Sequence, residues 1–146
     1  MLQLGRIISY NMNMPRDAQR GFKGFRLLHS FKAAASGFGQ TIRTEQNLRI
    51  HLVVMLLVLA AGIWLRLESV EWLLVIVCVG AVISAELLNT ALEYLCDVVR
   101  DEMKLNYKVT KHPRDMAAAA VLMTSIMAAG VGVAIFGPKV WDLFFG

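Results

Sequence analysis

The sequence predicts an all-α integral membrane protein with three transmembrane helices and an N-terminal amphipathic helix at the membrane surface. Hydrophobic residues make up 57% of the 146 residues and charged residues only 18%, so polar side chains are too few to cover a soluble globule. The apolar residues also gather in three long runs. Cys78 and Cys96 both lie inside apolar stretches, which indicates buried thiols rather than a disulfide framework or a zinc site.

The N-terminal region is basic. We expect residues 1–21 to form a flexible extension and residues 22–146 to form the membrane domain. Between about residues 24 and 46, apolar side chains recur every three or four positions, which is typical of an amphipathic surface helix. A helix packed on a soluble partner is the alternative. Eight Lys or Arg but only two acidic residues precede the first apolar run. In a membrane protein this excess of positive charge indicates first the orientation in the membrane and attraction to anionic lipid, and only second nucleic-acid binding.

The three spans are expected at about residues 48–67, 70–99 and 115–137. The second is about 45 Å long at 1.5 Å per residue, so its C-terminal turns should emerge from the bilayer core. In the third, Pro113 and Asp115 suit the first helical turn, small residues permit close helix packing, and Gly137-Pro138 should end the helix. Positive charge before the first span and at 100–114 predicts a cytoplasmic N-terminus and second loop, with the first loop and the C-terminus outside.

One face of the second span is acidic. Glu86, Asn89, Glu93 and Asp97 fall at i, i+3, i+7 and i+11, within one narrow stripe of a helix. Carboxylates that face lipid are costly, so by default they mark a site inside a helix bundle or at its mouth. The alternative is a helix that has left the bilayer by Glu86 and carries ordinary solvated charges.

The surrounding segments indicate phosphate chemistry. Carboxylate oxygens suit Mg²⁺, which prefers one or two carboxylates together with phosphate oxygens and water. The basic loop at 100–114 and the N-terminus of the third span can receive phosphate groups. Together they predict phosphoryl transfer from a magnesium nucleotide to a molecule in the bilayer. Gly37-Phe38-Gly39 lacks the spacing and the lysine of a P-loop. A non-enzymatic oligomer, either an ion or proton pathway or an assembly subunit, is the alternative.

Three stretches resemble the prokaryotic diacylglycerol kinase family, which includes undecaprenol kinases. They are E-L-L-N-T-A-L-E at 86–93 followed by Asp97, T-E-Q-N-L-R-I-H at 44–51, and R-D-M-A-A-A-A-V at 114–121. The likeness covers roughly residues 22–137. It implies a homotrimeric lipid kinase of the bacterial inner membrane, with active sites between neighbouring subunits, that uses ATP and Mg²⁺ and binds no nucleic acid. Its substrate would be diacylglycerol or undecaprenol, which the residues leave open.

The resemblance also assigns roles. It implies that Glu86 is the catalytic base on the lipid hydroxyl and that Glu45 and Glu93 hold the magnesium. Glu45 could instead pair with Arg49 at i+4. The family usually has Lys where this chain has Arg114, and the loop before it varies in length. Residues implied to support the site are Arg49, Asn89 and Asp97, and those implied to contact the nucleotide are Arg26, Asn106, Tyr107, Lys108, Arg114 and Asp115.

Overall fold

The computed structural model describes the backbone of residues 16–146 and the side chains from residue 27 onward. Most of the expected basic extension, residues 1–15, lies outside the described residues, and so does the side chain of Arg26. The described chain contains four helices and no strand, which confirms the all-α prediction. The helices are α2 (Arg16–Thr44), α3 (Gln46–Trp64), α4 (Ser69–Glu102) and α5 (Tyr107–Phe145).

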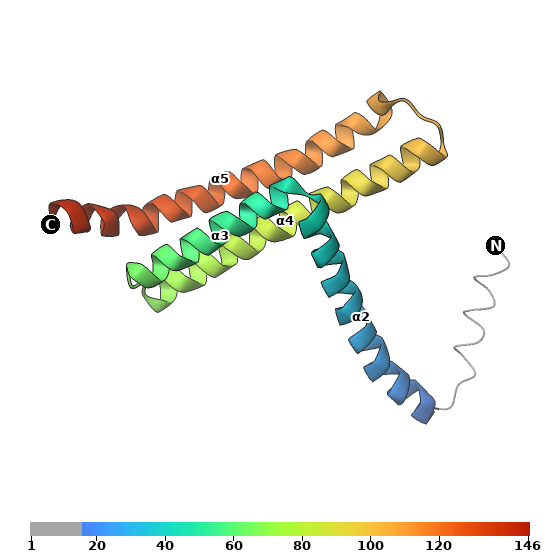
Figure 1. Cartoon of the computed structure of the whole chain (residues 1–146), viewed down its shortest axis with the longest axis horizontal. Coiled ribbons are helices and arrows are strands. Elements are labelled where there is room, and N and C mark those ends of the chain that lie inside the picture. The colour runs from blue at the N-terminus through green and yellow to red at the C-terminus, as the bar shows by residue number, and fades with distance from the viewer. Residues whose placement is uncertain (1–15) are drawn as a thin grey trace. The chain divides into compact units, whose positions relative to one another are not determined.

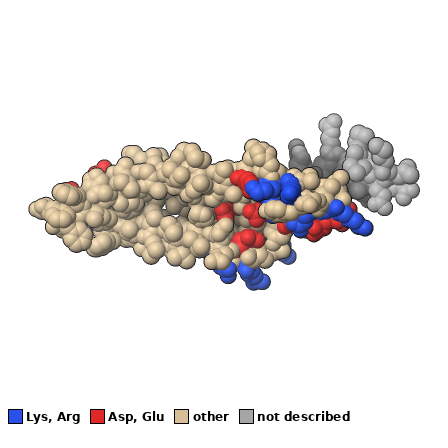
Figure 2. Space-filling view, turned by 90° about the horizontal axis from the view of Figure 1, so that it is seen from above, with Lys and Arg blue, Asp and Glu red and all other residues tan. Residues whose placement is uncertain are grey.

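Helices α3, α4 and α5 are each long and apolar enough to cross a membrane, which confirms the three predicted spans. They belong to one compact unit, Thr41–Gly146. In Figure 1 the three helices run alongside one another, and the α3–α4 connection lies at the same end as the C-terminus. Most of their large apolar side chains are exposed, as expected for surfaces that meet lipid. Figure 2 shows an uncharged surface over the middle of these helices, with Lys and Arg gathered toward one end.

The α3–α4 connection is tight. Glu68 caps α4 in a capping box, where its backbone N–H donates to Glu71 Oε2 at 2.7 Å. Arg66 takes a left-handed backbone conformation with φ of 50° to make the turn. Gly62 is needed beside it, because a Cβ there would lie 2.9 Å from both Leu67 Cδ1 and Trp72 Cη2.

Helices α4 and α5 pack antiparallel along most of their length. Two ion pairs bracket their contact, one from Arg114 to Asp97 and one from Lys139 Nζ to Glu71 Oε2 at 3.0 Å. The partners lie twenty-six residues apart on α4 and twenty-five on α5. Because both helices rise 1.5 Å per residue, the near-equal spacing keeps one register over about 39 Å.

The ends of α5 correct two predictions. The helix begins at Tyr107 rather than near Pro113, because the Asn106 side chain accepts a hydrogen bond from the Lys108 N–H at 3.1 Å and caps an earlier start. It also continues through Pro138 to Phe145. Proline removes one backbone donor, which membrane helices tolerate, and Trp141 and Phe145 pack one turn apart with ring centroids 4.6 Å apart.

Candidate active site

The acidic stripe of α4 faces into the three-helix unit. Val75, Val82, Glu86 and Asn89 form a buried face at helical spacing, and Glu86 and Asn89 are only 3% and 7% exposed. The interpretation of solvated charges is therefore wrong for Glu86. That interpretation fits Asp97 better, because Asp97 lies three turns further along α4 and its side chain is 41% exposed.

Several ionisable side chains lie near Glu86. It lies within electrostatic range of His51 on α3, of Glu93 on its own helix and of Glu45. Glu45 occupies the N-cap position of α3, and its side chain makes no capping hydrogen bond. Three carboxylates from two parts of the chain thus share one end of the bundle.

Asn89 and Glu93 form the next layer of this stripe. Asn89 Nδ2 donates to Glu93 Oε1 at 2.9 Å, which fixes the orientation of that carboxylate. The amide oxygen of Asn89, Oδ1, is buried and has no hydrogen-bond partner among the described residues. A buried oxygen of this kind is suited to a donor group or a cation.

These oxygens test whether the site suits magnesium. Within the described part of the chain, no three His, Cys, Asp or Glu side chains are grouped so that they could hold a metal by themselves. The oxygens that are present, from Glu45, Glu93 and Asn89, are the kind that Mg²⁺ takes, and this ion commonly completes its shell with phosphate oxygens and water. The donor set therefore fits magnesium that arrives with a nucleotide.

The segment around Glu45 is tied to α4. Tyr94 Oη donates to Thr44 Oγ1 at 3.5 Å, next to Glu45 in the chain. The ion pairs of the described residues do not join Glu45 to Arg49, whose side chain is exposed. The geometry gives Glu45 a place near the acidic stripe and offers no support for the alternative pairing.

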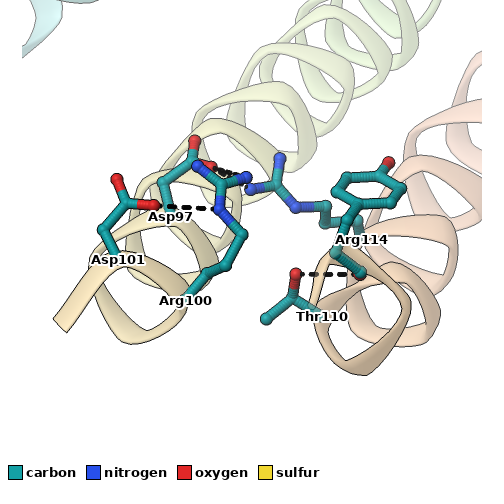
Figure 3. A network of polar contacts seen from close by, with 6 residues as sticks. Asp97, Arg100, Asp101, Thr110 and Arg114 are labelled. Atoms are coloured by element: carbon teal, nitrogen blue, oxygen red, sulfur yellow. Dashed lines mark hydrogen bonds and ion pairs between the residues drawn. The ribbon is translucent and has the colours of Figure 1, made fainter. Parts of the chain in front are cut away.

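A second polar group lies where α4 ends and α5 begins (Figure 3). The carboxylate of Asp97 accepts from Arg114 on α5 and from Arg100 Nη1 at 2.8 Å, while Arg100 Nε also donates to Asp101 at 2.9 Å. The Arg114 guanidinium carbon lies 5.7 Å from the centroid of the Tyr107 ring, within cation–π range. Arg114 Nε is buried and has no partner among the described residues. Asp97 thus positions Arg114, whose Nε–H has no acceptor among the described residues.

The expected nucleotide contacts are partly gathered here. Tyr107 and Arg114 stack, Asp115 pairs with Lys111, and Lys108 is exposed at the helix start. Asn106 is engaged as the N-cap of α5. The side chain of Arg26 is outside the described residues, so its contact stays a prediction.

Sequence reasoning missed Arg100 and His51. The i, i+3 spacing of Asp97 and Arg100 was a usable signal for the first. No such signal exists for His51, because the histidines share no metal-like spacing and its proximity to Glu86 depends on how α3 packs on α4.

Three apolar helices around the buried carboxylate of Glu86 define a membrane protein with a polar site inside its bundle. Comparison with known proteins gives the family. The sequence model of the prokaryotic diacylglycerol kinase family matches residues 32–136, and the chain belongs to this family.

Two relatives illustrate the likeness. An undecaprenol kinase from Bacillus subtilis (strain 168) is 34% identical over 114 residues, covering 78% of this chain and 90% of that one. A diacylglycerol kinase from Synechocystis sp. (strain ATCC 27184 / PCC 6803 / Kazusa) is 33% identical over 117 residues, covering 80% and 66%. The protein is a membrane lipid kinase, so the alternative of a non-enzymatic oligomer is wrong.

Proposed function

We propose that the protein transfers the γ-phosphoryl group of ATP to the hydroxyl of a membrane lipid at the cytoplasmic face, with Glu86 as general base. The observation that carries this proposal is the buried carboxylate of Glu86, with the ionisable side chains of Glu45, Glu93 and His51 around it. Among the described residues no hydrogen bond occupies that carboxylate, so it can accept a proton from an incoming alcohol.

The reaction balances with few groups. Glu86 takes the hydroxyl proton as the lipid oxygen attacks the γ-phosphorus, the bond to the β-phosphate oxygen breaks, and ADP leaves. The proton on Glu86 then passes to water. The products are ADP and a lipid phosphate, either phosphatidic acid or undecaprenyl phosphate. Positioning and charge neutralisation supply most of the rate enhancement in such reactions.

Glu45 and Glu93 would hold the magnesium, with Asn89 orienting Glu93 through its 2.9 Å hydrogen bond. A magnesium ion held there would supply charge neutralisation for the phosphates of the nucleotide. At the start of α5, Arg114 is positioned by Asp97 and would contact a phosphate oxygen through the 15% of its side chain that is exposed. The remaining proposed nucleotide contacts are Arg26, Asn106, Tyr107, Lys108 and Asp115, and Arg49 supports the first span near the site.

The assembly is part of the proposal. The family resemblance supports a homotrimer with active sites between subunits, and the basic residues before the first span support a cytoplasmic N-terminus with the C-terminus outside. We propose that the part of α2 from residue 24 to Thr44 is the surface helix, within the domain of residues 22–146. One relative is named for undecaprenol and the other for diacylglycerol, so both alcohols are candidate substrates.

The test is a phosphorylation assay in sealed vesicles that hold the purified protein in one orientation. Magnesium and radiolabelled ATP are added to one side only, with undecaprenol or diacylglycerol in the bilayer. We expect labelled lipid when ATP meets the side that carries the N-terminus, and none when it meets the other side. Absence of labelled lipid from both sides would overturn the proposal.

A further inference from the structure

The carboxylate of Asp97 on α4 binds two arginines through the same oxygen (Figure 3). Arg100, one turn further along α4, donates from Nη1 to Asp97 Oδ1 at 2.8 Å, and Arg114 of α5 donates to that oxygen as well. One carboxylate carries one negative charge, so either arginine alone would neutralise it. One of the two guanidinium groups is therefore not required for charge balance at Asp97.

Arg100 is held by two carboxylates of its own helix. Its Nε donates to Asp101 at 2.9 Å while its Nη1 donates to Asp97, so the planar guanidinium bridges two acids. Asp97, Arg100 and Asp101 stand at i, i+3 and i+4, the spacing at which side chains of one helix meet. Arg100 also lies in the last turn of α4, where the helix dipole favours a cation. The position of Arg100 is therefore set within α4.

Arg114 is held less completely. Among the carboxylates of the described residues it pairs with Asp97 alone, and its other contact is the Tyr107 ring, which carries no charge. Its side chain is 15% exposed, and its buried Nε has no acceptor in the described part of the chain. Arginine binds phosphate oxygens readily through its several donors. Arg114 is therefore the member of this network that can take a further anion.

A phosphate that binds Arg114 competes with Asp97 for the guanidinium. An Asp97 carboxylate that lost its counter-charge in a partly buried place would resist this exchange. Arg100 lowers that cost, because its own bonds to Asp97 and Asp101 do not involve Arg114. Without Arg100, the two aspartates would repel each other at i and i+4, and both would repel an arriving phosphate.

We propose that Arg100 is a positioning residue for nucleotide binding: it keeps Asp97 neutralised, so that Arg114 can exchange part of its ion pair for a phosphate oxygen of the nucleotide. This inference rests on the proposed contact between Arg114 and the nucleotide. Arg100 acts only through Asp97, which distinguishes it from a residue that contacts the phosphates directly.

The test measures the Kd of a non-hydrolysable ATP analogue with Mg²⁺ by calorimetry, on the full-length protein in mixed micelles, together with the KM for ATP and kcat. Arg100→Gln should raise the Kd and the KM about fivefold, as expected for a half-buried charge pair. Its kcat at saturating ATP should stay within about twofold of the wild type, which also reports that the variant folds. Arg100→Lys keeps the charge and should stay within about twofold of the wild type in all three quantities.

Lys104→Gln is the matched control. Lys104 is exposed, follows Arg100 by four residues and forms no ion pair among the described residues. The substitution removes the same charge from the same end of α4 without changing the surroundings of Asp97. The Kd of the analogue should therefore change less than about twofold.

The variant Asp97→Asn tests whether Arg100 acts through Asp97. Its amide oxygen can still accept from Arg114 but carries no charge for Arg100 to neutralise. In this background, Arg100→Gln should change the Kd less than about twofold.

Three results would overturn the inference about Arg100. The first is a fivefold effect of Arg100→Gln that persists in Asp97→Asn, because Arg100 would then contact the phosphates itself. The second is an Arg100→Gln effect no larger than that of Lys104→Gln, and the third is an equal loss in Arg100→Lys. A wild type that binds the analogue but phosphorylates no lipid would instead overturn the proposed function, and the Kd values would still decide the role of Arg100.

Discussion

The ion pair between Asp97 and Arg114 gives a quantitative test of how α4 holds the start of α5. In a double-mutant cycle, Asp97→Asn and Arg114→Gln are made singly and together, and the free energy of unfolding is measured in mixed micelles without nucleotide. The cycle isolates the interaction between these two side chains from the effect that each change has alone.

The expected coupling free energy follows from how exposed the two side chains are. The Arg114 side chain is 15% exposed and that of Asp97 is 41% exposed, so the pair is neither fully buried nor on the open surface. Exposed pairs contribute about 0–1 kcal/mol, whereas breaking a buried pair costs about 3–5 kcal/mol. We expect a coupling of about 1–2 kcal/mol for this half-buried pair.

Lys111 and Asp115, one helical turn apart on α5 and both exposed, form the matched control pair. Their coupling should not differ from zero within error, because solvent and salt screen the pair. A coupling for Asp97 and Arg114 that equals the control would refute the idea that this contact positions Arg114.

Two further predictions concern packing and the metal. Gly62→Val should destabilise the protein by about 1–3 kcal/mol in the same unfolding assay, because its Cβ would overlap Leu67 and Trp72. The control is Gly80→Val, which should cost less because a Cβ there meets nothing within 4 Å. Equal losses of stability in the two variants would contradict the tight turn between α3 and α4. Asn89→Leu should raise the magnesium concentration for half-maximal activity about tenfold, since it removes both the hydrogen bond that orients Glu93 and a free oxygen. Chelation with EDTA should abolish the activity of the wild type and added Mg²⁺ should restore it; an unchanged magnesium requirement in Asn89→Leu would remove this residue from the metal site.

Much of this architecture follows from local pattern. Long uncharged runs predict the helices α3, α4 and α5, because only fully hydrogen-bonded helices of that length suit the bilayer. The i, i+3, i+7 spacing from Glu86 to Glu93 predicts a shared face, and burial of Glu86 and Asn89 confirms that this face points inward. These features need only the period of one helix and the cost of placing a carboxylate in lipid.

Features that depend on contacts between helices could not be predicted from the sequence. The proximity of His51 to Glu86 arises from α3 packing on α4, which no spacing within either helix encodes. Small residues in α5 predict close packing, yet Ser125, Ala128 and Gly132 border a cavity because of what faces them. The helix also passes Pro138, where local propensity alone predicts an end.

The central claim is that Glu86 is the general base, and single-turnover phosphorylation tests it most directly. The measurement uses saturating ATP, magnesium and lipid with Glu86→Gln, and Glu102→Gln, an exposed glutamate at the end of the same helix, is the control. We predict that Glu86→Gln slows phosphoryl transfer about 10²–10⁴-fold with ATP binding unchanged, while the control keeps the wild-type rate. Transfer by Glu86→Gln at the wild-type rate would contradict the account.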